Sequence, residues 1–321
     1  MNQIRLPGGK RFVFTIIDDT DDALLENIRP VYNYLTERRI FITKTVWVYP
    51  PRDSASKGDS LSNPEYLRYM LELKRRGFEI ALHNVGSGDY TRDEILRGLE
   101  KYKELIGEYP KIHINHSHNP DNVYSGAKRF GFPVNLLVRF IYHKYSRFHG
   151  DDESSPYFWG DIHKRVIKFS RNYEFDELNV LKINPEMPYR ETRYQQYANY
   201  WFSVTFAPNP WCLNHIVTRE AIDRLEQEGG VCILYTHLGY YMKTGRIDAG
   251  FVERIDYISS KDTGLCIPVS ELLEHLLRVR EGDQYLTSLK RFRLELWHLL
   301  TRFKYRYVNQ IDDYTFKQVY P

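Results

Sequence analysis

The stretch Phe14-Thr15-Ile16-Ile17-Asp18-Asp19-Thr20 joins an apolar run to an abrupt acidic end. An apolar run rich in β-branched and aromatic residues predicts a strand, and the carboxylates then stand at its carboxyl end. Successive side chains of a strand point to opposite sides, so Asp18 and Asp19 face different surroundings. One of them can bind a metal ion while the other acts as a general base. A strand that merely ends in an acidic turn is the alternative.

Histidines stand at the ends of three later strand-like runs. His83, His116 and His237 each close such a run. In an α/β protein with parallel strands, the carboxyl ends of the strands meet at one end of the sheet or barrel. The sequence therefore predicts one barrel mouth that gathers these histidines and the paired aspartates.

Strand-like runs alternate with amphipathic segments of helical length, which is the pattern of a parallel sheet or barrel with crossover helices. Strands are predicted at residues 11–17, 41–48, 78–82, 111–115, 166–169, 180–183 and 231–236. Helices are predicted at residues 22–39, 64–76, 91–106, 219–228 and 270–280. The fold class is therefore α/β.

Local signals fix two of these helices. Pro64 suits a first helical position and Gly77 suits a position just past a helix end. Thr91 and Glu94 have the spacing of a capping box, in which each side chain binds a backbone amide near the other residue.

Composition excludes several classes of protein. The 321 residues include 45 Lys and Arg against 42 Asp and Glu, a net charge of +3, which gives no global signal for nucleic-acid binding. Three cysteines without CxxC spacing indicate neither a disulfide framework nor a cysteine zinc site. The sequence shows no signal-peptide pattern and no run of about 18 apolar residues. We expect a cytoplasmic protein.

In the order of its motifs the chain resembles the polysaccharide deacetylases with a NodB-homology domain, also called carbohydrate esterase family four. Their first motif, T-F-D-D-G, is similar to residues 15–20, which are one residue longer and have Thr20 at the glycine position. The resemblance implies a distorted (β/α) barrel over residues 1–283. It also implies that Asp18 is the catalytic base and Asp19 a metal ligand.

The second family motif begins with a histidine after a strand and has another histidine four residues on. Here His83 takes the first place and Ser87 the second, and serine is a poor zinc ligand. The family's third motif contains an arginine, which is absent where this chain has His116 and His118. We expect Asp19, His83 and His116 to bind a divalent metal, most simply Zn²⁺, with His118 as the competing third ligand.

The last family motif, L-x-H, is similar to residues 234–237 with one extra residue, which implies that His237 is the catalytic acid. The residues Trp159 and Asp161 are similar to the family's aspartate and tryptophan motif, and Arg171 is a substitute for the missing arginine that orients the base. These three residues are the expected substrate-binding set. The alternatives are that Trp159 belongs to the core and that Arg171 forms a surface ion pair.

Residues 284–321 form a second unit, a basic amphipathic helix and tail. Its apolar residues recur every three or four positions, which predicts one stripe along a helix. The stripe consists of Leu289, Phe292, Leu296, Leu299 and Phe303. Two interpretations remain open: the stripe docks on the barrel or on another subunit, or it lies on an anionic membrane surface.

The residues and the resemblance together imply a metal-dependent hydrolase that removes an N-acetyl group from a sugar unit in surface polysaccharide biosynthesis. The expected partner is an N-acetylated saccharide, whether nucleotide-linked, lipid-linked or oligomeric; a homo-oligomer and peripheral contact with the inner membrane surface stay open, and nucleic acid is not expected. A catalytically inactive saccharide-binding protein of the same fold is the main alternative. A metal-free glycoside hydrolase using Asp18 and Asp161 is a third.

Overall fold

Seven parallel strands form a closed barrel. The computed structural model describes residues 4–54, 56–116, 118–141, 147–243 and 245–308. The barrel strands are β1 (Phe12–Asp18), β2 (Thr43–Val46), β3 (Glu79–His83), β4 (Ile112–Ile114), β5 (Phe169–Phe175), β6 (Tyr200–Phe206) and β7 (Val231–Thr236). They follow one another in chain order around the barrel, and β1 pairs with β7 to close it. The predicted (β/α) barrel is confirmed.

Three further short strands lie outside this ring. Strand β10 (Gly264–Leu265) pairs with the beginning of β1, and β8 (Met242–Lys243) forms a small hairpin with β9 (Arg246–Ile247).

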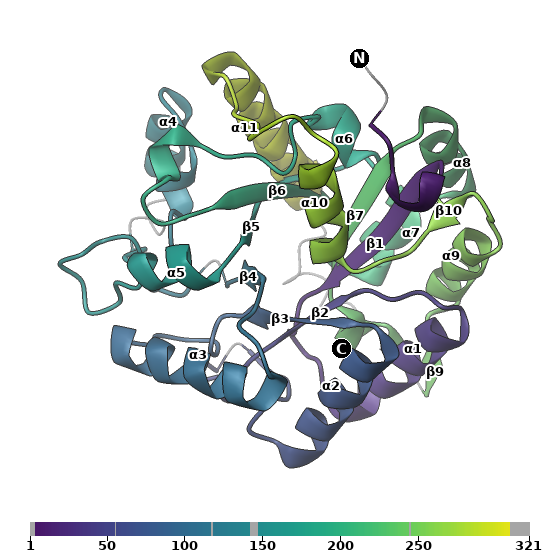
Figure 1. Ribbon diagram of the computed structural model, residues 1–321, viewed down its shortest axis with the longest axis horizontal. Coiled ribbons are helices and arrows are strands. Elements are labelled where there is room, and N and C mark those ends of the chain that lie inside the picture. The colour runs from purple at the N-terminus through teal and green to yellow at the C-terminus, as the bar shows by residue number, and fades with distance from the viewer. Residues whose placement is uncertain (1–3, 55, 117, 142–146, 244, 309–321) are drawn as a thin grey trace.

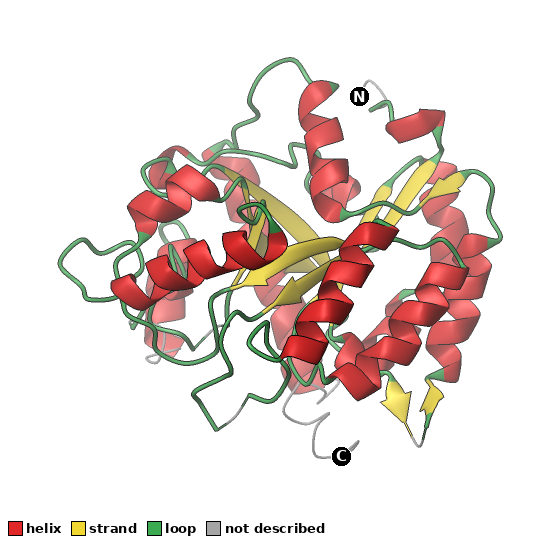
Figure 2. Ribbon diagram, turned by 60° about the horizontal axis from the view of Figure 1, so that its bottom comes forward, coloured by secondary structure: helices red, strands yellow, loops and turns green. Residues whose placement is uncertain are grey.

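Helices surround the strands (Figures 1 and 2). They are α1 (Leu25–Glu37), α2 (Pro64–Arg76), α3 (Arg92–Ile106), α4 (Val134–Ile141), α5 (Gly160–Val166), α6 (Val180–Ile183), α7 (Pro210–Ile216), α8 (Arg219–Glu228), α9 (Ala249–Ser259), α10 (Val269–Arg278) and α11 (Ser288–Phe303). Helix α10 lies over the amino end of the barrel, where the Val269 amide donates to Thr43 Oγ1 at 2.8 Å. The carboxyl end of the barrel remains for the functional site.

The central strands have both faces buried, since side chains fill the barrel inside and helices cover it outside. Every residue of β1 and of β7 is buried, including the polar Thr15 and Thr236. An apolar run bounded by polar residues is the sequence form of such a strand, which is why residues 11–17 and 231–236 were predictable.

The predicted helix ends are confirmed at three helices. Helix α2 spans Pro64–Arg76, and Gly77 follows with φ 107°, a left-handed conformation that glycine adopts without strain. Thr91 and Glu94 form the capping box that begins α3. Helix α8 also has its predicted bounds, Arg219–Glu228.

Three of the differences from the prediction concern the strands, and helices α4, α5, α7 and α9 were not predicted. Residues 180–183 form the short helix α6, not a strand. The strand predicted at 166–169 begins only at Phe169 and continues to Phe175 as β5. Strand β6 (Tyr200–Phe206) was not predicted, because its aromatic and hydroxyl residues lack the alternation that marks a half-buried strand.

The predicted C-terminal helix exists as α11 and packs along β5, but its apolar stripe faces away from the barrel. Leu289, Phe292, Leu296 and Phe303 are 61%, 39%, 45% and 56% exposed, and Leu299 alone of the stripe is partly buried against the core. The buried positions are mostly polar: the Glu295 carboxylate accepts from the Gly131 amide at 2.7 Å, and His298 Nδ1 accepts from the Glu174 amide at 3.1 Å. The helix therefore docks on the barrel through its polar face.

This orientation predicts a large loss of stability for a substitution on the inner side of α11 and almost none for a substitution on its outer side. Glu295→Ala is expected to lower the free energy of unfolding by roughly 2–5 kcal/mol, because it leaves a buried amide and the nearby Arg291 guanidinium without their acceptor. Leu300→Ser should change it by less than about 0.5 kcal/mol, as is usual for exposed side chains. Urea unfolding followed by circular dichroism measures both. A larger loss in Leu300→Ser than in Glu295→Ala would contradict the described packing.

Candidate functional site

Four strands deliver the site residues to the carboxyl end of the barrel. Asp19 directly follows β1, His83 is the last residue of β3, His116 lies two residues past β4, and His237 directly follows β7. Asp19, His83 and His237 are each no more than 3% exposed. The structure thus brings the strand-end residues named from the sequence into one buried cluster.

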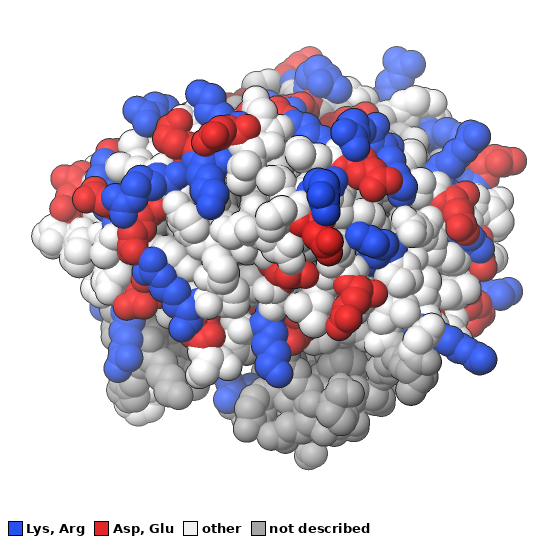
Figure 3. Space-filling model, turned by 90° about the horizontal axis from the view of Figure 1, so that it is seen from below, with Lys and Arg blue, Asp and Glu red and all other residues white. Residues whose placement is uncertain are grey.

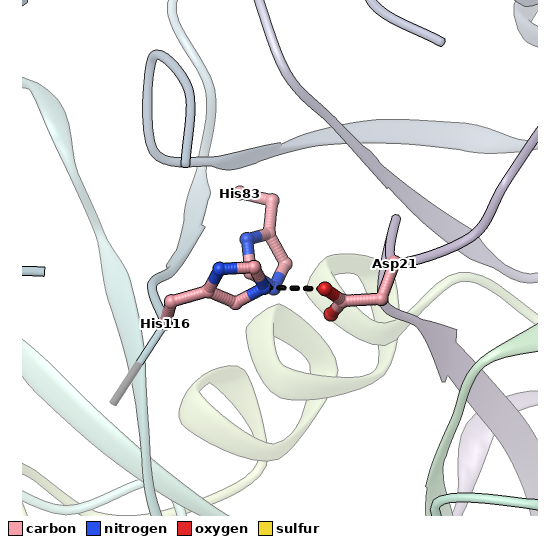
Figure 4. Close-up of side chains that lie close together, drawn as sticks. All are labelled: Asp21, His83 and His116. Carbon is pink, nitrogen blue, oxygen red and sulfur yellow. Dashed lines mark ion pairs between the residues drawn. The ribbon is translucent and has the colours of Figure 1, made fainter. Parts of the chain in front are cut away.

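Asp21, His83 and His116 form a group suited to a metal ion. One ligand atom from each lies within 4.8 Å of the other two. In Figure 4 the two imidazoles and the carboxylate point toward one another, and His116 Nε2 lies 2.6 Å from Asp21 Oδ1. Two imidazole nitrogens and one carboxylate oxygen are a donor set that zinc accepts, with a fourth position left for water or substrate. The residues present therefore fit a divalent cation.

Sequence reasoning had not identified Asp21. The acidic run continues past Thr20 with Asp21 and Asp22, and this was the available signal. The family motif matched only the first two aspartates, so the third and fourth were left without a role. In the structure it is Asp21, not the expected Asp19, that groups with both histidines.

Asp19 is instead held by an arginine. Arg171, from β5, donates through Nη1 to Oδ1 at 3.1 Å and through Nη2 to Oδ2 at 2.8 Å. The Arg171 guanidinium also stacks 4.1 Å from the Tyr235 ring centre and lies 4.0 Å from Glu174. Arg171 was expected to orient the base, and its partner in the structure is Asp19.

The electrostatics of Asp19 and Asp21 keep both carboxylates ionised. Burial alone would raise the pKa of Asp19, but Arg171 and His83 lower it well below the usual value. At Asp21 burial also raises the pKa, but His116 and His237 lower it further, so the pKa of Asp21 lies well below its usual value. The reciprocal effect appears at His116, where burial lowers the pKa but the Asp21 carboxylate raises it more.

Asp18 faces the opposite way, as strand alternation requires. Its Oδ2 accepts from the Tyr32 hydroxyl at 2.7 Å and lies 3.0 Å from Lys44 Nζ, while Oδ1 accepts from the Leu238 amide at 2.7 Å. Asp18, Tyr32 and Lys44 are fully buried. This carboxylate therefore links β1 to α1, to β2 and to the loop after β7, and it has none of the site histidines as a partner in these contacts.

His237 lies on the other side of Asp21. Its Nδ1 is 2.6 Å from the Pro208 carbonyl, so Nδ1 carries the hydrogen and donates it. Its Nε2 lies 3.3 Å from Asp21 Oδ2 and 3.3 Å from the Tyr235 hydroxyl. A second proton on this ring would therefore reside on Nε2, toward Asp21 and the interior of the site.

Ser87 stands at the position of the family's second histidine. It contacts His116, the histidine expected to take over the role of that missing ligand. Ser87 Oγ lies 2.6 Å from His116 Nδ1 and 2.9 Å from Ser56 Oγ. Because His116 Nε2 faces Asp21, its Nδ1 is free to donate to the serine. A hydrogen bond of this kind fixes the tautomer and the ring orientation of a metal-binding histidine.

His118 lies on the outer side of His116. It is half exposed, and Asp53, His116 and His118 form a second group of close potential ligand atoms. His118 Nε2 is 3.5 Å from Ser87 Oγ and 3.7 Å from Asp53 Oδ2, whereas His83 is absent from this group. His118 thus belongs to the rim of the site, and His116 to its centre.

Asparagines hold the loop that carries His116. The Asn115 amide donates to Asp121 Oδ1 at 2.8 Å, and the Asn122 amide donates to the His116 carbonyl at 2.5 Å. Asn84, next to His83, donates to Asp121 Oδ2 at 2.6 Å. The asparagine-rich loop at residues 115–122 therefore holds His116 beside His83.

The remaining expected residues lie elsewhere. Trp159 has no exposed surface, donates from Nε1 to the Asp121 carbonyl at 2.7 Å and packs against His113. Asp161 forms a two-bond ion pair with Arg92 at the start of α3, with both distances 2.7 Å. The structure brings neither residue to the histidine cluster. Through its hydrogen bond to the Asp121 carbonyl, Trp159 supports the loop that follows His116.

No protein-family model matches the sequence, and no curated protein matches it. The fold does match solved structures. The crystal structure of PuuE allantoinase is 13% identical, with a TM-score of 0.54 over 87% of this chain and 94% of the other. That of a probable polysaccharide deacetylase from Pseudomonas aeruginosa PAO1 is also 13% identical, with a TM-score of 0.52 over 87% and 95%.

At this identity the likeness establishes the fold, and the two neighbours carry names for different activities, so the activity must be argued from the site.

The Asp18–Lys44 ion pair predicts a stability effect separate from catalysis. Lys44→Met should lower the free energy of unfolding by roughly 3–5 kcal/mol, because it leaves Asp18 buried without its cation. The double variant Asp18→Asn/Lys44→Met should recover much of this loss, since no buried charge remains. Guanidinium unfolding of the three proteins gives the answer. An equal loss in the single and double variants would mean that the charge itself is not the cause.

Asp121 predicts a pH dependence of stability. Burial raises the pKa of Asp121 to about 7 despite hydrogen bonds from Asn115 and Asn84. Between about pH 4 and pH 7 the folded protein holds a proton that the unfolded chain has released, so stability falls as pH rises through this range.

In the wild type this fall in the free energy of unfolding should reach up to about 4 kcal/mol at pH 8, and Asp121→Asn should remove it. The side-chain oxygen of Asn84 has no hydrogen-bond partner among the described residues. If the Asn84 amide group flips, this oxygen can accept a hydrogen bond from the new amide at position 121. Unfolding at pH 5 and pH 8 for both proteins measures the difference. A variant with the wild-type slope would assign the slope to another group.

The chain has the (β/α) barrel fold of the polysaccharide deacetylases, with a C-terminal helix.

Proposed function

We propose that the protein is a metal-dependent hydrolase that removes an N-acetyl group from a sugar unit. The observation that carries the proposal is the Asp21, His83 and His116 group beside the Arg171-held Asp19 at the barrel mouth. A cation site and an ionised carboxylate side by side are what hydrolysis of an amide by water requires.

The proposed roles follow the geometry. Asp21, His83 and His116 hold the divalent ion, most simply Zn²⁺. Asp19 is the base and Arg171 its positioning partner. Compared with the roles implied by the family motif, the base moves from Asp18 to Asp19 and the metal-binding carboxylate from Asp19 to Asp21.

A divalent cation supplies a Lewis acid that polarises the acyl carbonyl and makes water a stronger acid. The pKa of Asp19 is lowered, so this carboxylate is ionised at neutral pH but is a weak base. Arg171 and Asp19 form two parallel hydrogen bonds, which fix the plane of the carboxylate. With a divalent cation bound, which would lower the pKa of water, Asp19 would be held in a fixed position to accept the proton of a water molecule.

His237 is the proposed acid. Its Nδ1 donates to the Pro208 carbonyl, so the proton that it can give resides on Nε2. The Asp21 carboxylate, 3.3 Å away, stabilises the protonated ring before transfer to the leaving amine. The products would be acetate and a free amino sugar.

The substrate class rests on the fold neighbour from Pseudomonas aeruginosa, which is described as a probable polysaccharide deacetylase. We propose an N-acetylated saccharide of surface polysaccharide biosynthesis, such as capsule, O-antigen or exopolysaccharide, handled in the cytoplasm. None of the described helices is long and apolar enough to cross a membrane.

A catalytically inactive saccharide-binding protein is the second candidate. The specific observation in its favour is the direct contact of 2.6 Å between His116 and Asp21, which an imidazolium–carboxylate pair can form without a cation. Metal content separates the two candidates.

Elemental analysis of purified protein tests the proposal. The wild type should contain about one zinc ion per chain, and Asp21→Ala, His83→Ala and His116→Ala should lose it, because each removes one of three protein ligands. Asp19→Asn should keep it and should no longer release acetate from a panel of free, nucleotide-linked and oligomeric N-acetyl sugars. Metal loss in Asp19→Asn but not in Asp21→Ala would restore the roles implied by the family motif.

Two results control this experiment. Ser87→Ala keeps all three ligands and removes only the hydrogen bond to His116, so metal affinity should fall by about 10–100-fold without being abolished. Circular dichroism of every variant shows whether it remains folded. A wild type that stays free of metal after zinc is supplied would favour the saccharide-binding candidate.

A further inference from the structure

Helices α4 and α11 present large apolar side chains to solvent on one face. Seven of them are between 45% and 78% exposed: Leu136, Leu137, Phe140, Leu289, Leu296, Leu300 and Phe303. We call this the α4–α11 face. Soluble proteins seldom expose apolar patches of this kind unless they bind something there.

The two helices are packed together, so their exposed residues form one surface. The Gly131 amide, just before α4, donates to Glu295 of α11 at 2.7 Å. Val138 of α4 and Leu294 of α11 are buried in the same hydrophobic cluster. The outward residues of both helices therefore lie on the same side of the barrel.

Helix α11 has its amphipathic faces reversed. Toward the barrel it directs Glu295, His298 and Thr301, each of which is buried. A helix that served only to cover β5 would gain stability by turning its leucines inward. The outward leucines therefore indicate a second surface that α11 contacts.

The charged side chains that α4 and α11 themselves direct outward are basic, while Glu186 and Asp176 beside α11 pair with Lys290 and Lys304. Helix α4 contains Arg139 and no acidic residue, and the sole acidic residue of α11, Glu295, is buried against the barrel. Arg139 and Arg293 are exposed, and they differ from Lys290 and Arg291, which pair with glutamates. The face shown in Figure 3 is different, since basic and acidic side chains are interspersed there.

We infer that the α4–α11 face lies on an anionic membrane surface. Exposed leucine and phenylalanine side chains beside arginines that form no ion pair with any described residue are the composition of helices that bind in the interface of acidic lipid bilayers. A second copy of the chain would bring arginines of the same sign to this face and would offer no acidic partner from α4 or α11. Charge complementarity therefore selects the lipid surface.

The direction of α11 relates this face to the mouth of the barrel. Its middle contacts Glu174 through His298, and Tyr305, two residues past its end, packs on Phe206 at the end of β6. The helix thus runs toward the rim where Asp19 and His237 lie. A sugar carried on a membrane lipid would reach that rim; this use of the face rests on the proposed deacetylase function, whereas the membrane contact does not.

Vesicle sedimentation of the full chain tests the inference. The protein should sediment with vesicles that contain phosphatidylglycerol and not with vesicles of phosphatidylcholine alone. Leu289→Glu/Leu296→Glu/Leu300→Glu should weaken binding roughly tenfold or more. Arg139→Gln/Arg293→Gln should weaken it by roughly fivefold per arginine and reduce its dependence on salt.

Matched controls come from other parts of the barrel. Val279→Glu changes a 40% exposed apolar residue just after α10, and Arg75→Gln/Arg97→Gln removes two exposed arginines of α2 and α3; both should bind as the wild type does. Absence of binding to either vesicle, or equal loss in variants and controls, would overturn the inference. So would a dimer, seen by analytical ultracentrifugation, that Leu296→Glu dissociates, because it would assign the face to self-association. Metal content stays a separate measurement, so failure here leaves the proposed function untouched.

Discussion

The buried Asp18 carboxylate is the interaction on which the arrangement of the mouth depends. Its oxygens are satisfied by a phenol, an ammonium and a backbone amide that come from α1, β2 and the loop after β7. Three parts of the barrel are thereby fixed relative to the end of β1. Since neighbouring residues of a strand face opposite ways, anchoring Asp18 outside the barrel directs Asp19 into its mouth.

The roles of the acidic residues follow from this anchor. Asp19, one position on, meets Arg171 from the far side of the barrel, and Asp21, two positions further, meets the histidines. The acidic run thus separates three tasks: structure at Asp18, an oriented carboxylate at Asp19, and a position beside the imidazoles at Asp21. The same backbone segment could not place two adjacent carboxylates at one ion without releasing the first from Lys44.

Sequence reasoning reached the barrel and the histidine strand ends because strand-length apolar runs, Gly77 and the Thr91 capping box are local signals. It could not decide which aspartate faces the mouth. Both faces of β1 are buried, so hydrophobicity carries no information about the inward side. The side of α11 that faces the barrel could not be predicted for a related reason. The periodicity of its apolar residues predicts a helix, but its inward face is set by contacts with Glu174 and the Gly131 amide, which are distant in sequence.

The ion pairs of Glu174 have a further consequence. Arg302 of α11 lies 3.4 Å from one oxygen of Glu174, and Arg171 lies 4.0 Å from the other. Arg171 in turn holds Asp19. A chain cut before Ser288 by a protease would lose Arg302, leave Glu174 with less positive charge nearby and draw Arg171 more strongly toward it. Through Arg302 and Glu174, the C-terminal helix thus helps to set the position of Arg171 and of the base that Arg171 holds. Removing the helix would alter a site to which it contributes no ligand.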